Sequence, residues 1–232
     1  DARARGFRMT NGQRVDRRGE TIGVYGNDTD VTFTADSKVK RTGRVKIIDA
    51  SSLVPSHIGG VENVEHFLPE AQPKKRTDAA STVSATLIAQ NMDNPKMTNV
   101  ASSAYEGAPI VNKRGEVIQG NNRSAAILEM YQTQQQKAAE YKQYLIDHAA
   151  EFGLNAEEVA AMQNPVLVRE LDVDDADAIT LGQYTMQDME SGGNQMIDSG
   201  RAIAGLSNKG LLEDFIAMLL AEENEETSDM NL

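Results

Sequence analysis

A strand-to-helix junction at residues 117–126 constrains the fold of this chain more than any other stretch. Apolar strand-forming residues lead into Gly120, and a helical pattern begins near Asn122. Gly permits an unusual φ and a close backbone approach at such a turn. The amides that follow lie at a helix N-terminus, where they lack intrahelical partners and the helix dipole is positive. The junction therefore predicts a phosphate-binding strand-turn-helix element made by Gly120, Asn121, Asn122, Arg123 and Ser124.

Arg123 strengthens this prediction by its position. A cation in the first turn of a helix gains nothing from the dipole, so it is more easily explained if an anion sits there. Its planar guanidinium is well suited to hold a phosphate. An ordinary strand–Gly–helix turn with a surface arginine explains the same residues equally well on local physics.

The remaining periodicity indicates an α+β fold. Strands are expected at residues 44–49, 108–111, 116–119 and 165–171, and a hairpin at residues 21–35 with its turn at residues 26–28. Helices are expected at residues 79–92, from 122 to about 149 as one long helix, and at 155–162, 176–184, 197–204 and 210–223. Because strands come early and helices late, we expect a small mixed sheet, with helices predominating in the C-terminal half.

Composition excludes several kinds of site. The absence of Cys rules out disulfides, thiolate metal sites and cysteine catalysis. With only His57, His66 and His148, no histidine zinc cluster is expected, and we predict no metal-binding residues. No apolar run approaches the roughly 20 residues that span a bilayer, so we expect no membrane association and a cytoplasmic location. The first residue is Asp rather than Met, so further domains of a longer polypeptide are expected partners.

Charge is distributed unevenly along the chain. Residues 1–46 carry a net charge of +5 within a total of −12. We expect residues 1–44 to form a basic extended arm with a β-hairpin, residues 45–204 to form the main domain, and residues 205–232 to form a helix and acidic tail. The arm would be a solvated, flexible segment or would touch nucleic acid or an acidic partner, whereas the acidic body disfavours unspecific DNA binding.

Several short motifs occur in an order that resembles a known superfamily. They are residues 54–57, residues 72–76 (Gln-Pro-Lys-Lys-Arg), residues 107–111, the Gly120–Arg123 turn, and residues 165–168. Together they resemble the ParB/sulfiredoxin-like superfamily, most closely the ParB-like domain of phage and plasmid polyvalent proteins. Those proteins are implicated in antirestriction or DNA processing. The resemblance covers about residues 45–204.

The resemblance implies a pocket at the Gly120 turn that holds the phosphates of a nucleotide or of DNA. Lys74 and Arg76 would reach in from the opposite loop, and Gln72 and Asn122 would give orienting hydrogen bonds. A nucleoside triphosphate with Mg²⁺ is the expected cofactor, and nucleotide, DNA and other phage or plasmid proteins are the expected partners. Members of the superfamily include nucleotide-dependent DNA clamps, a kinase, sulfiredoxins and nucleases, so the fold does not fix the reaction.

Position 121 departs from the family pattern. Sulfiredoxin chemistry requires Cys there, so that activity is excluded, and the clamp proteins usually carry an acid there. Without a carboxylate at 121, a phosphohydrolase (an NTPase or nuclease) would lack its obvious base or magnesium ligand. Catalytic candidates elsewhere are His57, which is also explained as a structural loop residue, and the carboxylates Asp78, Glu116 and Asp188.

We therefore expect a nucleotide- or nucleic-acid-phosphate-binding domain of a mobile-element DNA-processing protein, with hydrolase activity as an open question. The alternative is a non-catalytic module that docks DNA or a protein within a larger assembly. The acidic cluster at residues 172–177 lacks the Gly and terminal Glu of a calcium loop, so we interpret it as a solvated helix start.

Overall fold

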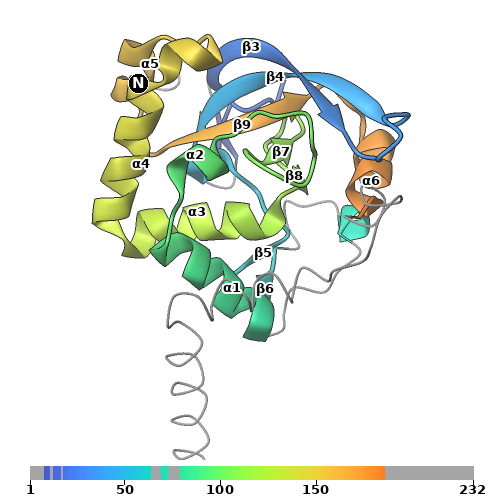
Figure 1. Ribbon diagram of the computed structural model, residues 1–232, viewed down its shortest axis with the longest axis horizontal. Coiled ribbons are helices and arrows are strands. Elements are labelled where there is room, and N and C mark those ends of the chain that lie inside the picture. The colour runs from blue at the N-terminus through green and yellow to red at the C-terminus, as the bar shows by residue number, and fades with distance from the viewer. Residues whose placement is uncertain (1–7, 11–12, 17, 64–68, 73–78, 186–232) are drawn as a thin grey trace, which may run out of the picture. The chain divides into compact units, whose positions relative to one another are not determined.

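A five-stranded sheet lies at the centre of the fold, with the strand order β3–β4–β9–β7–β8 (Figure 1). The computed structural model describes residues 8–10, 13–16, 18–63, 69–72 and 79–185. Neighbouring strands are antiparallel except β7 and β9, which are parallel. The sheet is therefore mixed, as the sequence predicts. Its strands are β3 (Gly23–Thr32), β4 (Lys40–Asp49), β7 (Ile110–Val111), β8 (Val117–Gln119) and β9 (Pro165–Leu171).

Strand β9 is the central strand, and all seven of its residues are buried. The run of branched apolar residues at its start suits a strand that is covered on both faces. Arg169 and Glu170 are buried with the rest. Because a buried charge needs partners, these two residues organise much of the polar structure described below.

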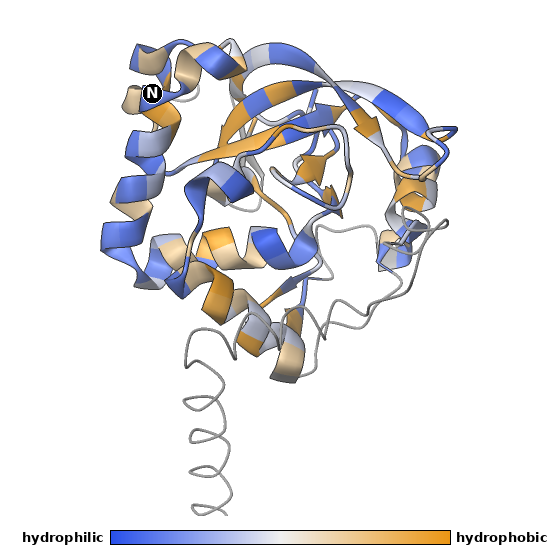
Figure 2. Ribbon diagram, in the orientation of Figure 1, coloured by the Kyte–Doolittle hydropathy of each residue, from blue (hydrophilic) through white to orange (hydrophobic). Residues whose placement is uncertain are grey.

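Helices cover the sheet on several sides (Figure 1). Helices α4 and α5 lie at one end of the sheet, α6 lies at the other, and α1 and α3 run below it. Figure 2 shows apolar residues recurring along β4, β9 and α3, while most of α4 is hydrophilic. The α-helices are α1 (Ala79–Gln90), α2 (Asn94–Met97), α3 (Asn121–Thr133), α4 (Gln135–Asp147), α5 (Ala156–Ala161) and α6 (Asp175–Gln183).

Shorter elements complete the described chain. Two small hairpins form from β1 (Arg8–Thr10) with β2 (Gln13–Val15) and from β5 (His57–Ile58) with β6 (Val61–Glu62). Single turns of 3₁₀ helix occur at Ala50–Ser52, Pro69–Ala71 and Ala149–Phe152. The strands lie mainly in the first half and the helices α3 to α6 in the second, so the predicted α+β class is confirmed.

The hairpin predicted at residues 21–35 is wrong. Residues 23–32 form the single strand β3, and the expected turn at residues 26–28 is a shift in its register against β4 between Tyr25 and Asp28. Gly26 packs so closely on the carbonyl of Phe152 that a Cβ there would collide with it. The local turn signal therefore marks a β-bulge that fits a neighbouring segment.

The long helix predicted from residue 122 to about 149 is also wrong in one respect. It breaks at Gln134, whose φ of −123° and ψ of 66° separate α3 from α4. The break lets two tyrosines, one from each helix, reach the start of β9. The hydroxyl of Tyr131 donates to the Pro165 carbonyl at 2.6 Å, and that of Tyr141 accepts from the Leu167 amide at 3.4 Å.

The described residues all lie in one compact unit, residues 1–189. Within the expected basic arm, residues 23–32 form β3 and residues 40–44 form the first part of β4, so both segments belong to the sheet that contains β9. The helices predicted at residues 197–204 and 210–223 lie outside the described residues. None of the described helices combines the length and apolar character that a bilayer-spanning segment needs.

Candidate functional site

Gly120 turns the chain from β8 into α3. It adopts the left-handed conformation, with φ 94° and ψ 25°, at the N-cap position, and no side chain caps the helix there. A Cβ at this position would lie 2.9 Å from Nη2 of Arg123. The positive φ is therefore what favours glycine here, and a Cβ would in addition displace the end of the Arg123 side chain. The unusual φ predicted for this turn is confirmed.

Arg123 lies against Gly120 and contacts the loop at residues 101–108. Its Nη1 donates to the Tyr105 carbonyl at 2.6 Å, and its side chain is half-buried. Arg169 reaches the same loop from β9, and its five N–H groups donate to the carbonyls of Ala101, Ser103, Glu106 and Ala108. Two arginines thus hold this loop against the first turn of α3.

The pKa of Arg169 reflects that environment. Burial, together with the nearby Arg123 cation, lowers its pKa to about 9. This value is still above neutrality, so Arg169 is a cation at pH 7. Part of the donor capacity of Arg123 is likewise committed to protein, which the sequence did not predict.

Asn121 connects three segments at the start of α3. It is buried, its Oδ1 accepts from the Ser56 amide at 2.7 Å, and its Nδ2 donates to Oε1 of Gln72 at 2.9 Å. The hydroxyl of Ser56 in turn lies 2.9 Å from Nδ1 of His57. The structure therefore brings together three of the predicted site residues: Gln72, His57 and Asn121.

A pocket of about 320 Å³ lies beside this turn, between α1, α3 and the β5–β6 hairpin. Its only charged or titratable lining groups among the described residues are His57 and Glu129. The others are small, hydroxyl or amide side chains, apart from Ile58. The residues that line it are His57, Ile58, Gly59, Gly60, Ser81, Thr82, Ala85, Thr86, Asn121, Asn122, Ala125, Glu129, Gln132 and Thr133.

Two side-chain hydrogen bonds join α1 to α3 at the pocket. Asn122 Nδ2 donates to Oγ of Ser84 at 2.9 Å, and Thr86 Oγ1 donates to Oε2 of Glu129 at 3.1 Å. Asn122 is among the site residues predicted from the sequence, whereas Thr86 and Glu129 are not. Asn122, Ala125 and Glu129 recur every three or four residues along one face of α3, but solvated helix faces share this spacing, so it does not by itself mark a site.

The other predicted residues are placed elsewhere or are not described. Ser124 is buried, and its hydroxyl donates to the Gly120 carbonyl at 3.1 Å, so it hydrogen-bonds within the first turn of α3. Glu116 accepts from Asn112 at 2.6 Å and from Arg114, so it stabilises the β7–β8 turn and does not line the pocket. Lys74, Arg76, Asp78 and Asp188 lie outside the described residues.

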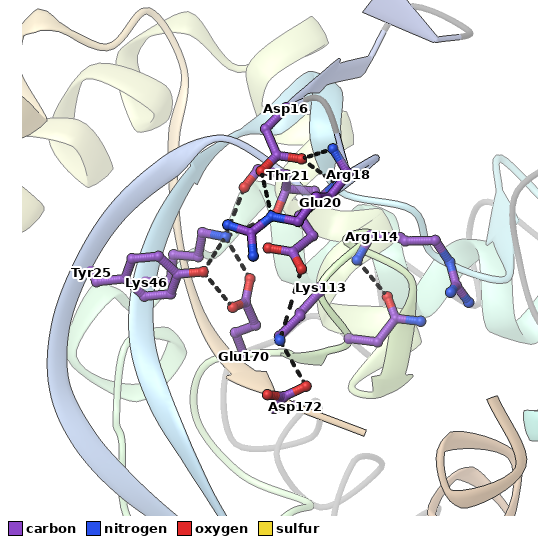
Figure 3. Close-up of polar contacts among 11 residues, drawn as sticks. Asp16, Arg18, Glu20, Thr21, Tyr25, Lys46, Lys113, Arg114, Glu170 and Asp172 are labelled. Atoms are coloured by element: carbon purple, nitrogen blue, oxygen red, sulfur yellow. Dashed lines mark hydrogen bonds and ion pairs between the residues drawn. The ribbon is translucent and has the colours of Figure 1, made fainter. Parts of the chain in front are cut away.

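A second polar cluster lies across β3, β4 and β9 (Figure 3). The ammonium of Lys46 donates to Glu170 Oε2, to the hydroxyl of Tyr25 at 3.1 Å, and to the carbonyl and hydroxyl of Thr21 at 2.8 and 3.2 Å. Tyr25 donates to the other carboxylate oxygen of Glu170 at 2.8 Å. Burial and the Glu170 carboxylate raise the pKa of Tyr25, which stays protonated. Each of these groups is satisfied within the protein.

The acidic cluster at residues 172–177 is paired with basic side chains. Asp172 contacts Lys113 at 2.8 Å, Asp175 contacts Arg114 at 2.5 Å, and Asp177 contacts Arg41 at 2.6 Å. The side chain of Asp174 caps α6 by accepting from the Asp177 amide. Within the described ranges, no group of three or more His, Asp or Glu side chains is placed to bind a metal ion.

Comparison with protein families gives one match. The family model described as ddrB-like ParB superfamily domain matches residues 36–172, more than half of the chain. Comparisons with curated proteins and with solved structures give no match.

Proposed function

Because the chain belongs to the ddrB-like ParB superfamily, we propose that it binds a nucleotide in the pocket beside the Gly120 turn, with a phosphate at the N-terminus of α3. Membership in this superfamily indicates a nucleic-acid-related role with DNA as a partner. The finer proposal, which rests on the resemblance of its motifs, is that the domain works within a phage- or plasmid-encoded DNA-processing protein.

The observation that carries the proposal is the start of α3 at the pocket wall. The helix begins at Asn121 without a side-chain cap, directly after the left-handed Gly120, and Asn121 and Asn122 both line the pocket. The amides of a first helical turn and the positive end of the dipole favour an anion. A phosphate is the anion that a nucleic-acid-related domain would hold there.

The pocket itself supplies room and hydrogen-bonding groups. Its volume of about 320 Å³ is near the lower end of the roughly 300–1,000 Å³ of small-molecule sites. Gln72 fixes Asn121 by a hydrogen bond and so acts as a positioning residue. Lys74 and Arg76 remain proposed phosphate ligands, and a nucleoside triphosphate with Mg²⁺ remains the proposed cofactor.

Asn122→Asp tests the phosphate position. The carboxylate can still accept a hydrogen bond from Ser84, so we expect the fold to be retained. A negative charge near the phosphate should weaken nucleotide binding by more than about 1.4 kcal/mol, which is a tenfold change in affinity. Asn155→Asp is the matched control. It makes the same charge change at the N-cap of α5, where Asn155 accepts from the Glu157 and Glu158 amides and Asp serves equally well.

Isothermal titration calorimetry of the full chain with nucleoside triphosphates, with and without Mg²⁺, measures the binding affinity of each protein. We expect binding by wild type and by Asn155→Asp, and at least about tenfold weaker binding by Asn122→Asp. Absence of nucleotide binding, or equal affinity for all three proteins, overturns the proposal. Phosphate release in the same samples decides whether bound nucleotide is hydrolysed, and binding of DNA without any nucleotide favours a docking module.

A further inference from the structure

The electrostatic character of the pocket differs between its two ends along α3. Asn122 and Glu129 line the same wall and are seven residues apart, which places them about 10 Å apart along the helix. The Asn122 end lies at the start of the helix, where the helix dipole is positive. The other end carries the carboxylate of Glu129. A ligand that fills the pocket therefore meets a positive end and a negative end.

Glu129 keeps acceptor capacity in this position. Its hydrogen bond from Thr86 goes to Oε2 at 3.1 Å, and Glu129 forms no ion pair within the described part of the chain. No Lys or Arg is among the described residues that line the pocket. A phosphate at this end would be repelled by the carboxylate, whereas a neutral group with N–H donors would be bound. The negative end is thus suited to the base of a nucleotide.

The chemistry of a carboxylate selects among the four bases. Guanine presents two adjacent donors, N1–H and the 2-amino group, which match the two carboxylate oxygens. Adenine and cytosine present an amino group beside a ring-nitrogen acceptor, and uracil presents one N–H between two carbonyls. In those three bases an acceptor faces a carboxylate oxygen and repels it.

We propose that Glu129 is the specificity-determining residue of this pocket and that it selects a guanine nucleotide, with Thr86 holding the carboxylate in place. This inference rests on the nucleotide binding proposed above. The separation of about 10 Å between the helix start and Glu129 corresponds to the span of a nucleoside monophosphate, with the phosphate at Asn122 and the base at Glu129. The hydroxyl and amide groups of Ser81, Thr82 and Gln132 lie along the same pocket and suit a ribose.

The test is isothermal titration of the full chain with GTP, ITP, ATP, CTP and UTP. We expect GTP to bind at least about tenfold more tightly than ATP, CTP or UTP, and ITP, which lacks the 2-amino group, to fall between them. In Glu129→Gln the side-chain amide presents one acceptor and one donor. We therefore expect the preference for guanine to be lost and the affinity for ATP or CTP to rise. The Gln side chain can still accept from Thr86, and thermal unfolding checks that the fold is retained.

Glu140→Gln is the matched control, because it removes the same charge from an exposed position on α4 outside the pocket. It should keep the guanine preference of the wild type. Equal binding of the four common nucleotides, or a guanine preference that survives in Glu129→Gln, overturns this inference and leaves the proposed nucleotide binding intact. Failure of every nucleotide to bind overturns both.

Discussion

Lys46 on β4 and Glu170 on β9 form an ion pair with 2.5 Å between Nζ and Oε2, in the interior of the protein. Lys46 is 0% and Glu170 is 5% exposed. In the register of the sheet Lys46 lies opposite Val168 and Glu170 lies opposite Arg44, so the pair crosses diagonally between neighbouring strands. Tyr25, the partner of Lys46 on β3, contacts both charged groups. Three strands thus share one polar cluster, in which the ion pair is buried and Tyr25 is partly exposed.

Removal of one member of this pair should destabilise the fold strongly. Lys46→Met or Glu170→Leu leaves an uncompensated buried charge, so we expect each to lower the free energy of unfolding by about 3–5 kcal/mol. The double variant removes both charges and should lose less than either single variant. Urea denaturation of the four proteins measures these differences. A loss below about 1 kcal/mol in both single variants would contradict the role given to the pair.

Strand β3 should be needed for folding, although it precedes the matched family region at residues 36–172. A chain that begins at residue 36 lacks β3, which exposes the edge of β4 and removes Thr21 and Tyr25 from Lys46. We expect this chain to show no cooperative unfolding and to aggregate. A chain that begins at residue 13 keeps both residues and should unfold cooperatively. Thermal denaturation with size-exclusion chromatography distinguishes the two, and a folded monomer from residue 36 would refute this expectation.

Much of the fold was predictable because its signals are local. The buried strand at residues 165–171 is marked by its apolar run, the cap of α5 by Asn155, and the turn into α3 by Gly120. The hairpin at residues 21–35 failed for a tertiary reason, since Gly26 is required by its contact with Phe152 rather than by a turn. The Lys46–Glu170 pair was not predictable, because only strand pairing brings these residues together.

The candidate site was predictable only in part. Sequence motifs identified Gln72 and Asn121, which the structure joins by a hydrogen bond. They also singled out Arg123, but not its contact with the Tyr105 carbonyl, since residues 101–106 carry no recognisable signal. Glu129 was missed because a polar residue on a helix face is usually solvated. Its meaning depends on α1 packing beside it, which no local pattern reveals.

Arg169 should resist replacement even by lysine. The five N–H groups of arginine donate hydrogen bonds to four carbonyl oxygens of the loop at residues 101–108. Lysine has three N–H donors and lacks the planar geometry of the guanidinium. We expect Arg169→Lys to leave at least one buried carbonyl unsatisfied and to lower the free energy of unfolding by about 1–3 kcal/mol. Hydrogen exchange should become faster in residues 101–108 more than in α4. Unchanged exchange in this loop would show that other contacts hold it.

The ion pair between Arg41 on β4 and Asp177 on α6 should make a small, pH-dependent contribution to stability. Arg41 donates to both carboxylate oxygens, at 2.9 and 2.6 Å, and these hydrogen bonds lower the pKa of Asp177 below its ordinary 3.8. A carboxyl whose pKa is lower in the folded state stabilises the fold above its unfolded pKa. That stabilisation is lost as the pH falls through the folded pKa.

Arg41→Gln measures this contribution. Both side chains are partly exposed, so we expect the variant to lose no more than about 1 kcal/mol at pH 7. The difference from wild type should stay constant down to about pH 4 and shrink below it, because protonated Asp177 no longer gains from the cation. Urea denaturation at pH 7, 5 and 3.5 follows the trend, with Lys137→Gln at an exposed pair on α4 as the control. A difference that stays unchanged at pH 3.5 would mean that Arg41 stabilises the fold through packing rather than through Asp177.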